Sequence, residues 1–271
     1  KNELIEVVKG DLLKGEGLPD AFNAVHTAYY LVHSMGGKSI LSNREFAKDD
    51  KIAAKNFVAA ADDAGLKRVI YLGGLGEKGK NLSEHLRSRA EVAEILSSGK
   101  TQATILRAAV IVGAGGASYE MLRHLVEKLP VMVCPKWINT KIQPIAVRDV
   151  LAYLLGCLLN PDTAGKVFDI GGPDIMTCRE MMQQYAKAKE LCPRLIVSVP
   201  VLTPHLAAYW VDFVTPVSSG IAHPLIEGMK NEVICQEHSI DQYVPIKKTS
   251  FPDAARIAIE EGKEVKGTIG S

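Results

Sequence analysis

His85 and Arg89 are four residues apart and begin a stripe of helical spacing that continues through Val92 and Leu96. The far end of this stripe is apolar and is predicted to face the core, whereas its first two members are polar. Because burying an unpaired charge is costly, a buried stripe with this beginning needs a reason. One interpretation is that both side chains emerge beside a ligand, where His85 would act as a general acid or base near neutral pH. The alternative is that the first turn of the helix lies in solvent.

A second group of candidate residues follows the predicted strands. Gly10-Asp11-Leu12, Val32-His33-Ser34, Gly73-Gly74 and the run that starts at Gly113 each come directly after an apolar segment. In open parallel sheets ligands bind outside the carboxyl ends of the strands, and glycine lets a backbone approach a ligand closely. Each of these turns, taken alone, also suits a simple strand-to-helix connection. Together they favour a nucleotide-like ligand at one edge of a sheet.

The remaining candidates are weaker. Gly115, Gly116 and Ser118 would shape an anion or substrate pocket, or would belong to a plain loop. The other histidines have no metal-ligating neighbours in the sequence, so we predict no metal site. The residues interpreted as packing residues of the core include five methionines, Met121, Met132, Met176, Met181 and Met182.

An alternation of strands and helices must position these residues. The predicted strands cover residues 4–8, 28–32, 68–72, 104–112, 143–147 and 166–170. The predicted helices cover residues 45–64, 83–98, 150–159, 177–189 and 250–262, with a shorter helical stretch before residue 24. Apolar strands that alternate with helices indicate an α/β fold, in which a parallel sheet is covered on both faces.

Composition narrows the classes of function. The 271 residues carry 32 Lys and Arg against 31 Asp and Glu, and aromatic residues make up 6%. A net charge of +1 gives no electrostatic footprint for nucleic acid, and the few aromatic residues argue against a base-stacking surface. The five cysteines are scattered, which argues against a disulfide framework and predicts a reducing, cytoplasmic location.

The segment 195–225 has two interpretations. It is apolar and interrupted by prolines, which is typical of the core of a substrate-binding lobe. It would also support peripheral contact with a membrane, with Tyr209, Trp210 and Phe213 as interfacial anchors. We favour the buried lobe.

The order and spacing of six fragments resemble the short-chain dehydrogenase/reductase superfamily, in its atypical, extended-like branch with NmrA-like and epimerase-like members. The fragments are VKGDL (8–12), AKNFVAAA (54–61), GLKRVIYL (65–72), TILR (104–107), PIAVRDV (144–150) and FDIGGP (168–173). The resemblance implies a Rossmann-type doubly wound parallel sheet that lacks its first βαβ unit, with a smaller, mostly helical C-terminal lobe. Residues 1–113 would be the remainder of the dinucleotide domain. Residues 114–271 would be the substrate lobe, with 143–171 and 249–262 returning to the dinucleotide domain.

The resemblance also implies an NAD(P) cofactor. The residues that would surround it are Asp11 and Leu12 at the adenine, Leu31, Val32 and His33 near the ribose, and Ala108, Ala109 and Val110 near the nicotinamide. Gly73 and Gly74 would stand where the family has its catalytic Ser or Thr.

Two departures from the family pattern bear on the chemistry. The family's Tyr-x-x-x-Lys matches His85-Leu-Arg-Ser-Arg89 here, and glycine replaces the Ser or Thr. Arg89 would hold a ribose hydroxyl but cannot give up a proton, so the usual proton relay is absent. The family's glycine-rich phosphate loop, which also separates NAD from NADP, would precede Gly10, and nothing of it is present there. We therefore expect roughly 50–60 further residues upstream, since a βαβ unit takes at least about 30.

Two functions from different classes follow from these observations. The leading one is an NAD(P)-dependent oxidoreductase or epimerase-like enzyme that acts on a small molecule, with His85 and Arg89 as catalytic residues. The alternative is a non-catalytic NAD(P)-sensing regulator or assembly factor. The replaced Tyr, Lys and Ser or Thr positions favour the alternative.

Overall fold

The centre of the molecule is a parallel four-stranded sheet. The computed structural model describes residues 4–34, 41–76, 84–199, 214–217 and 219–269. The strands are β1 (Thr27–Tyr30), β2 (Arg68–Gly74), β3 (Gln102–Ala108) and β8 (Val167–Ile170), in the spatial order β1-β2-β3-β8. All neighbouring pairs are parallel, so their carboxyl ends meet at one edge. The predicted α/β, Rossmann-type fold class is confirmed.

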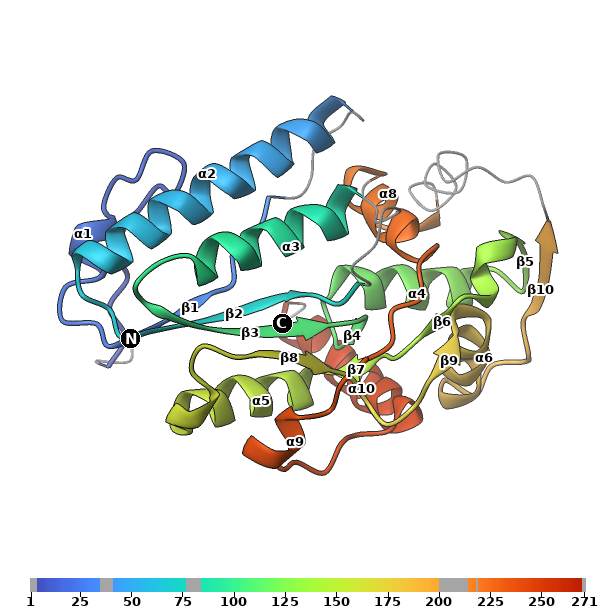
Figure 1. Ribbon diagram of the computed structural model, residues 1–271. Coiled ribbons are helices and arrows are strands. Elements are labelled where there is room, and N and C mark those ends of the chain that lie inside the picture. Colours follow the sequence, from blue (N-terminus) through green and yellow to red (C-terminus); the bar gives the residue numbers. More distant parts are fainter. Residues whose placement is uncertain (1–3, 35–40, 77–83, 200–213, 218, 270–271) are drawn as a thin grey trace.

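Helices cover both faces of this sheet (Figure 1). The helices of one face are α1 (Leu18–Ala21), α2 (Leu41–Asp63) and α3 (Glu84–Ser97), and the helix of the other face is α5 (Val147–Leu159). Successive side chains of a strand point to opposite faces, as β2 shows. Val69 and Tyr71 pack toward α2 and α3, whereas Ile70 between them packs toward α5.

Local signals in the sequence explain where some helices begin and end. Helix α2 is followed by Gly65, whose φ of +71° is strained for residues with a side chain. Helix α6 (Cys178–Ala188) begins with the predicted capping box. The Thr177 hydroxyl accepts from the backbone N–H of Glu180, and the Glu180 carboxylate accepts from the backbone N–H of Thr177.

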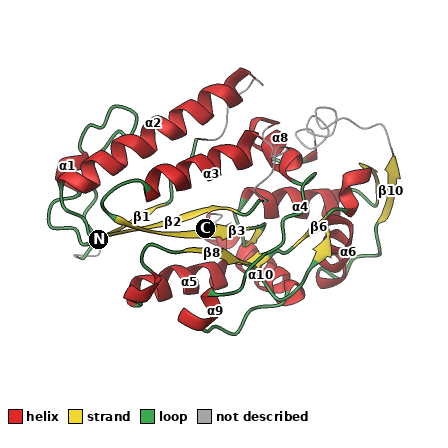
Figure 2. Cartoon of the chain, viewed as in Figure 1, coloured by secondary structure: helices red, strands yellow, loops and turns green. Residues whose placement is uncertain are grey.

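The rest of the described chain forms a second, mostly helical lobe (Figure 2). Its longer helices are α4 (Ala117–Lys128), α6, α8 (Ser219–Gly228) and α10 (Phe251–Ile269). Its strand pairs are β5 (Val131–Pro135) with β10 (Leu195–Val199), β4 (Ile111–Val112) with β7 (Ile145–Ala146), and β6 (Lys141–Ile142) with β9 (Met176–Thr177). The remaining short helical turns of the described chain are η1 (Lys136–Asn139), η2 (Pro161–Thr163) and α9 (Ile240–Tyr243).

The predicted strand over residues 4–8 is wrong. Within the described residues this segment pairs with no strand, and Leu4 and Val7 are each 92% exposed. A strand is held by ladder hydrogen bonds to a neighbouring strand, and among the described residues no strand forms such a ladder with this run. In the described sheet β1 is an edge strand whose neighbour is β2.

The predicted strands over 104–112 and 143–147 are also longer than the observed ones. The chain leaves the sheet after Ala108, whose carbonyl oxygen accepts from the N–H of Leu75. The Val110 carbonyl then accepts from the N–H of Ile145, and β4 pairs with β7 in place of the central sheet. The long apolar run is therefore divided between two sheets.

The C-terminal helix runs past Gly262, where we predicted its end. A glycine inside a helix costs only about 1 kcal/mol, which the rest of the helix can offset. Residues 249–262, expected beside the dinucleotide domain, enter α10, which packs on α6 and against β4 and β7.

Part of the segment 195–225 is described, as β10, residues 214–217 and most of α8. The predicted membrane anchors Tyr209, Trp210 and Phe213 lie outside the described residues. Among the helices of the described ranges, none combines the length and the apolar character that a membrane span requires.

Candidate functional site

Three of the predicted groups lie at the carboxyl edge of the sheet. Because β1, β2 and β3 are parallel and in register, residues 31–33, Gly73-Gly74 and residues 108–110 follow neighbouring strand ends. Leu31 and Val32 are 53% and 50% exposed, whereas Ala108 is buried. The edge therefore offers an exposed apolar surface beside the bare backbone of two glycines.

Helix α3 brings the Arg89 side chain to this edge. The pKa of His33 is lowered to about 4, first because its ring is partly removed from water and then because the Arg89 charge is near. Burial raises the pKa of Tyr71, and Arg89 acts against this rise. His33 is therefore uncharged at neutral pH, and Arg89 supplies a positive charge at the edge.

The predicted stripe on α3 is confirmed at its far end. Val92 and Leu96 are buried, and Arg89 is partly buried. His85 belongs to the first turn of α3, but its side chain lies outside the described part of the structure. Its role as an acid or base stays a prediction.

A buried carboxylate that we did not predict, Asp50, holds this edge together. Asp50 lies on α2 and is 7% exposed. Its carboxylate accepts from the Ser34 N–H at 2.7 Å and from the Ser88 hydroxyl at 3.1 Å, which ties the loop after β1 to α3. The signal was present in the sequence, because Asp50 is seven residues before Phe57 on the apolar face of the predicted helix.

The two glycines at the end of β2 are set by packing. A Cβ on Gly73 would lie 2.7 Å from Cε1 of the Tyr71 ring, so a side chain does not fit unless the ring moves. A Cβ on Gly74 would lie 3.4 Å from Leu86 and 3.6 Å from Arg89. The end of β2 therefore has close packing around its backbone in place of side chains.

Asp11 and Leu12 lie apart from His33 and Gly74. The Asp11 carboxylate accepts from the N–H groups of Leu13 and Lys14 in its own turn. The Leu12 carbonyl accepts from the Asn56 side chain at 2.8 Å. Asn56 is six residues beyond Asp50 on α2, about 9 Å along the helix axis, toward the amino ends of the strands (Figure 1). Contact of Asp11 and Leu12 with an adenine stays a prediction.

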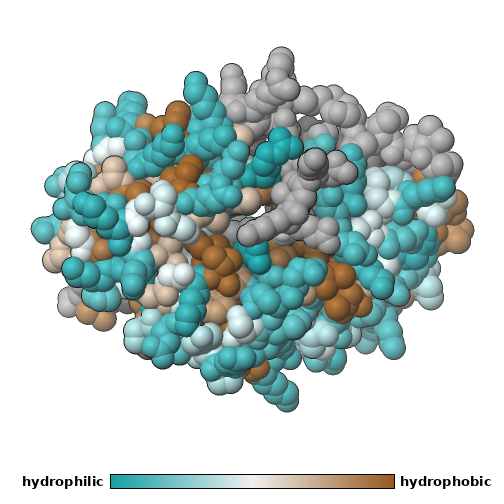
Figure 3. Space-filling view, viewed as in Figure 1, coloured by the Kyte–Doolittle hydropathy of each residue, from teal (hydrophilic) through white to brown (hydrophobic). Residues whose placement is uncertain are grey.

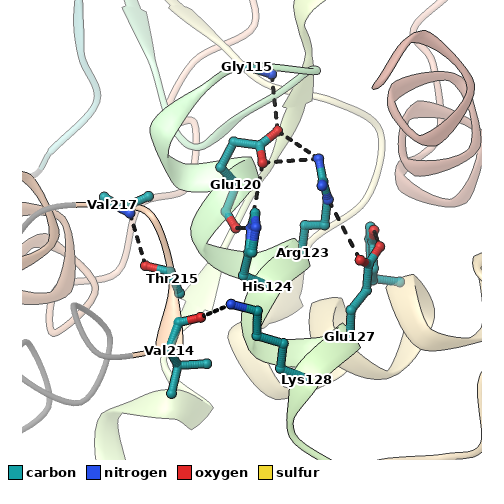
Figure 4. A network of polar contacts seen from close by, with 10 residues as sticks. Gly115, Glu120, Arg123, His124, Glu127, Lys128, Val214, Thr215 and Val217 are labelled. Atoms are coloured by element: carbon teal, nitrogen blue, oxygen red, sulfur yellow. Dashed lines mark hydrogen bonds and ion pairs between the residues drawn. The ribbon is translucent and has the colours of Figure 1, made fainter. Parts of the chain in front are cut away.

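The predicted substrate residues are not brought to one pocket. The Gly115 N–H donates to the Glu120 carboxylate at 3.3 Å, within a network along α4 (Figure 4). Gly116 is the exposed residue that precedes α4. Ser118 instead lines a separate apolar cavity. Across the described chain, no three or more His, Cys, Asp or Glu side chains gather as a metal site would require.

The residues at the strand ends fit part of a dinucleotide. Two glycines allow close approach of a ring, Leu31 and Val32 offer apolar contact, and Arg89 can donate several hydrogen bonds to ribose oxygens. This set suits the nicotinamide–ribose half. None of these residues lies at the N-terminus of a helix, where the pyrophosphate of a dinucleotide usually binds.

Two curated proteins with the same name are similar to part of this chain. The chain is 28% identical over 168 residues to NADH dehydrogenase (ubiquinone) 1 alpha subcomplex subunit 9, mitochondrial, of Arabidopsis thaliana, which covers 60% of this chain and 42% of that protein. It is 29% identical over 115 residues to the Mus musculus protein of the same name, covering 42% and 30%. The matched part is less than half the length of these relatives. No protein-family model matches the chain.

Solved structures with a similar fold are epimerases and related enzymes. An epimerase of Methanothermobacter thermautotrophicus superposes with a TM-score of 0.74 at 13% identity, covering 99% of this chain and 81% of that one. A nucleoside-diphosphate-sugar epimerase of Staphylococcus aureus gives 0.71 at 17% identity, with 94% and 84% covered. The Bordetella bronchiseptica enzyme WbmG, solved with NAD and UDP, gives 0.68 at 14% identity, with 96% and 80% covered. At these identities the likeness establishes the fold.

Proposed function

We propose that this chain, whose fold is that of the atypical, epimerase-like short-chain dehydrogenase/reductases, binds NAD(P) at the carboxyl edge of its sheet as a nucleotide-sensing or assembly component. The observation that carries the proposal is the packing of Gly73 against the Tyr71 ring. A bound NAD(P) would supply hydride chemistry, but turnover of an alcohol or carbonyl also needs a group that moves a proton. The described edge has no relay hydroxyl at Gly73-Gly74.

The side chains at the edge suit binding better than proton transfer. Arg89 would hold ribose hydroxyls through the N–H donors of its guanidinium. His33 would offer one donor and one acceptor in its neutral form, but a pKa of about 4 makes it a weak base at neutral pH. Asp50 would keep the loop after β1 in place through its bond to Ser34.

The named relatives support the same choice. Both curated proteins are named as subunits of an NADH dehydrogenase alpha subcomplex. A chain related to part of such a subunit is reasonably an accessory component of an assembly. The predicted cytoplasmic location and the choice between NAD and NADP stay predictions.

A turnover experiment tests the non-catalytic part of the proposal. The purified chain is incubated with NADH or NADPH and a panel of carbonyl compounds, or with the oxidised cofactors and alcohols, and absorbance at 340 nm is followed. We expect no change above that of the cofactor alone. Turnover that is lost in His85→Gln and kept in His238→Gln, an exposed histidine before α9, would contradict the proposal and restore His85 as the acid or base.

A further inference from the structure

An apolar cavity lies in the helical lobe, and of the residues assigned to the nucleotide only Val110 is among its described lining. Its volume is about 370 Å³, within the range of roughly 300–1,000 Å³ that is typical of small-molecule sites. Residues of α4, α6, α8 and β5 form its walls, and Val110 connects it to the end of β3. It therefore begins where the nucleotide edge ends.

The walls of the cavity are uncharged and rich in methionine. None of the described residues that line it carries a charge. Five of the seven methionines of the chain line it, namely Met121, Met132, Met181, Met182 and Met229. Methionine adapts its shape to irregular apolar ligands, so these walls suit a flexible chain better than one rigid ring. Four of the five are residues that we interpreted from the sequence as packing residues.

The mouth of the cavity opens on an apolar surface. Val131 and Val133 of β5 line the cavity and are 54% and 60% exposed. Leu195 and Val197 of β10 stand beside them in parallel register and are 61% and 44% exposed. Figure 3 shows hydrophobic residues gathered at the right-hand side of the molecule, where β5 and β10 lie. The exposed side chains that β5 and β10 present beside the cavity are therefore apolar.

The lining of the cavity also includes a hydrogen-bond donor. Trp137 lines it, and the Trp137 Nε1–H is buried without a hydrogen-bond partner in the described structure. An indole N–H only donates, and burying it unpaired is costly. The Ser118 hydroxyl is a second polar group in the wall. Both would pair with an acceptor oxygen on a ligand.

Polar contacts fix one wall of the cavity. The apolar residues of α4 face the cavity, whereas Arg123 of the same helix pairs with Glu120 at 3.1 Å and with Glu127 at 3.7 Å (Figure 4). The Lys128 ammonium donates to the Val214 carbonyl at 2.7 Å, and Val214 lines the cavity. These contacts within the protein therefore hold this wall of the cavity in place before a ligand binds.

We propose that this cavity binds a long, flexible hydrocarbon chain with one oxygen acceptor at its end, such as an acyl chain. The methylene groups would lie among the methionines, and the oxygen would accept from Trp137. The apolar surface of β5 and β10 would be the entrance. Val110 is shared with the nucleotide edge, but the proposed contacts with the methionines and Trp137 do not require bound NAD(P), so the two proposals are tested separately.

The test is a titration of the full chain with cis-parinaric acid, a fluorescent fatty acid. We expect saturable binding of one molecule per chain with a micromolar Kd. Leu125→Trp fills the cavity from α4 and should weaken binding at least tenfold, while Leu151→Trp, the same change at a 59% exposed position of α5, should leave it within twofold. Trp137→Phe keeps the apolar ring but removes the donor, and should weaken binding by roughly two- to tenfold.

Further variants and competitors keep the test decisive. Met229→Trp fills the cavity from the end of α8 and replaces Leu125→Trp if that variant does not fold. Displacement of the probe by free oleate identifies a free acid as the source of the chain, and displacement by phosphatidylcholine vesicles identifies a membrane lipid. Failure of the wild type to bind the probe, equal binding by filled and unfilled variants, or displacement by neither competitor would overturn the proposal.

Discussion

The Gly73 backbone lies directly against the Tyr71 ring, two residues earlier on the same face of β2, so that a Cβ on Gly73 would be 2.7 Å from Cε1. Tyr71 is 1% exposed and packs on Tyr30 with ring centroids 5.8 Å apart. The ring therefore has little room to yield. The end of β2 therefore presents bare backbone at the carboxyl edge of the sheet.

This contact predicts a difference between two neighbouring glycines. Gly73→Ala should lower the free energy of unfolding by about 1–3 kcal/mol, because the new methyl group displaces a buried ring. Gly74→Ala, whose Cβ would meet nothing closer than 3.4 Å, should cost less than about 1 kcal/mol. Urea unfolding of both variants measures the difference. Equal losses would show that the Tyr71 ring does not limit this position.

The ion pair between Arg107 and Asp169 joins β3 to β8, and we expect its loss to reduce the stability of the fold strongly. The Arg107 Nη2 and Asp169 Oδ1 atoms are 2.6 Å apart, and the Asp169 side chain is 0% exposed. Arg107→Met leaves this buried carboxylate without its ion-pair partner, with the Gln236 N–H at 2.9 Å as a remaining donor, and should lower the free energy of unfolding by about 3–5 kcal/mol. The matched control is Arg148→Met, because Arg148 pairs with Glu261 at 3.8 Å with 54% and 45% exposure, and should cost less than about 1 kcal/mol. Chemical unfolding with an unchanged m-value checks both numbers.

His33 predicts a pH dependence of stability. The pKa of His33 in the folded chain is about 4, below its ordinary value of 6.5. Between pH 4 and pH 6.5 the unfolded chain therefore binds a proton that the folded chain does not. The stability linked to His33 is complete above about pH 6.5 and is lost as the pH falls toward 4. His33→Gln should therefore lose less stability than the wild type between pH 7 and pH 5, although the ring keeps part of its surface in solvent. Urea unfolding at pH 7 and pH 5 measures this difference. An equal loss of unfolding free energy in the wild type and in His33→Gln would disprove this role.

The outer face of α5 predicts that the isolated chain associates with itself. Leu151, Leu155 and Leu159 are 59%, 54% and 73% exposed, and the Tyr29 hydroxyl of edge strand β1 donates to the Leu154 carbonyl beside them. Leu155→Lys should reduce association in sedimentation experiments and change the unfolding free energy by less than about 0.5 kcal/mol. Leu154→Lys, at a 7% exposed position, should instead destabilise the fold strongly. An unchanged sedimentation profile for Leu155→Lys would exclude this face from association.

The regular part of the fold could be predicted because local patterns and packing agree there. The helix expected over residues 45–64 forms as α2, and Val92 and Leu96 form the buried face of α3, as predicted. The prediction failed for residues 4–8, because a β-branched run does not carry the information whether a neighbouring strand exists.

The site was predictable only in part. Strand ends pointed to His33 and Gly73, since the order of strands in a parallel sheet decides which residues share an edge. Asp50 could not be assigned from the sequence because it lies within a helix and its partners Ser34 and Ser88 come from distant segments. The cavity of the helical lobe was missed because methionines that line a cavity and methionines that fill a core look alike in a sequence.

Calorimetric titration of NADPH and NADH into the intact chain tests the central claim most directly. The account predicts saturable binding of one cofactor per chain, without its oxidation. It also predicts that Arg89→Gln weakens binding about tenfold or more through loss of a charge-assisted hydrogen bond, while Arg256→Gln at the surface of α10 does not. Absence of binding by the wild type, or identical affinities of the wild type and Arg89→Gln, would contradict a nucleotide site at this edge.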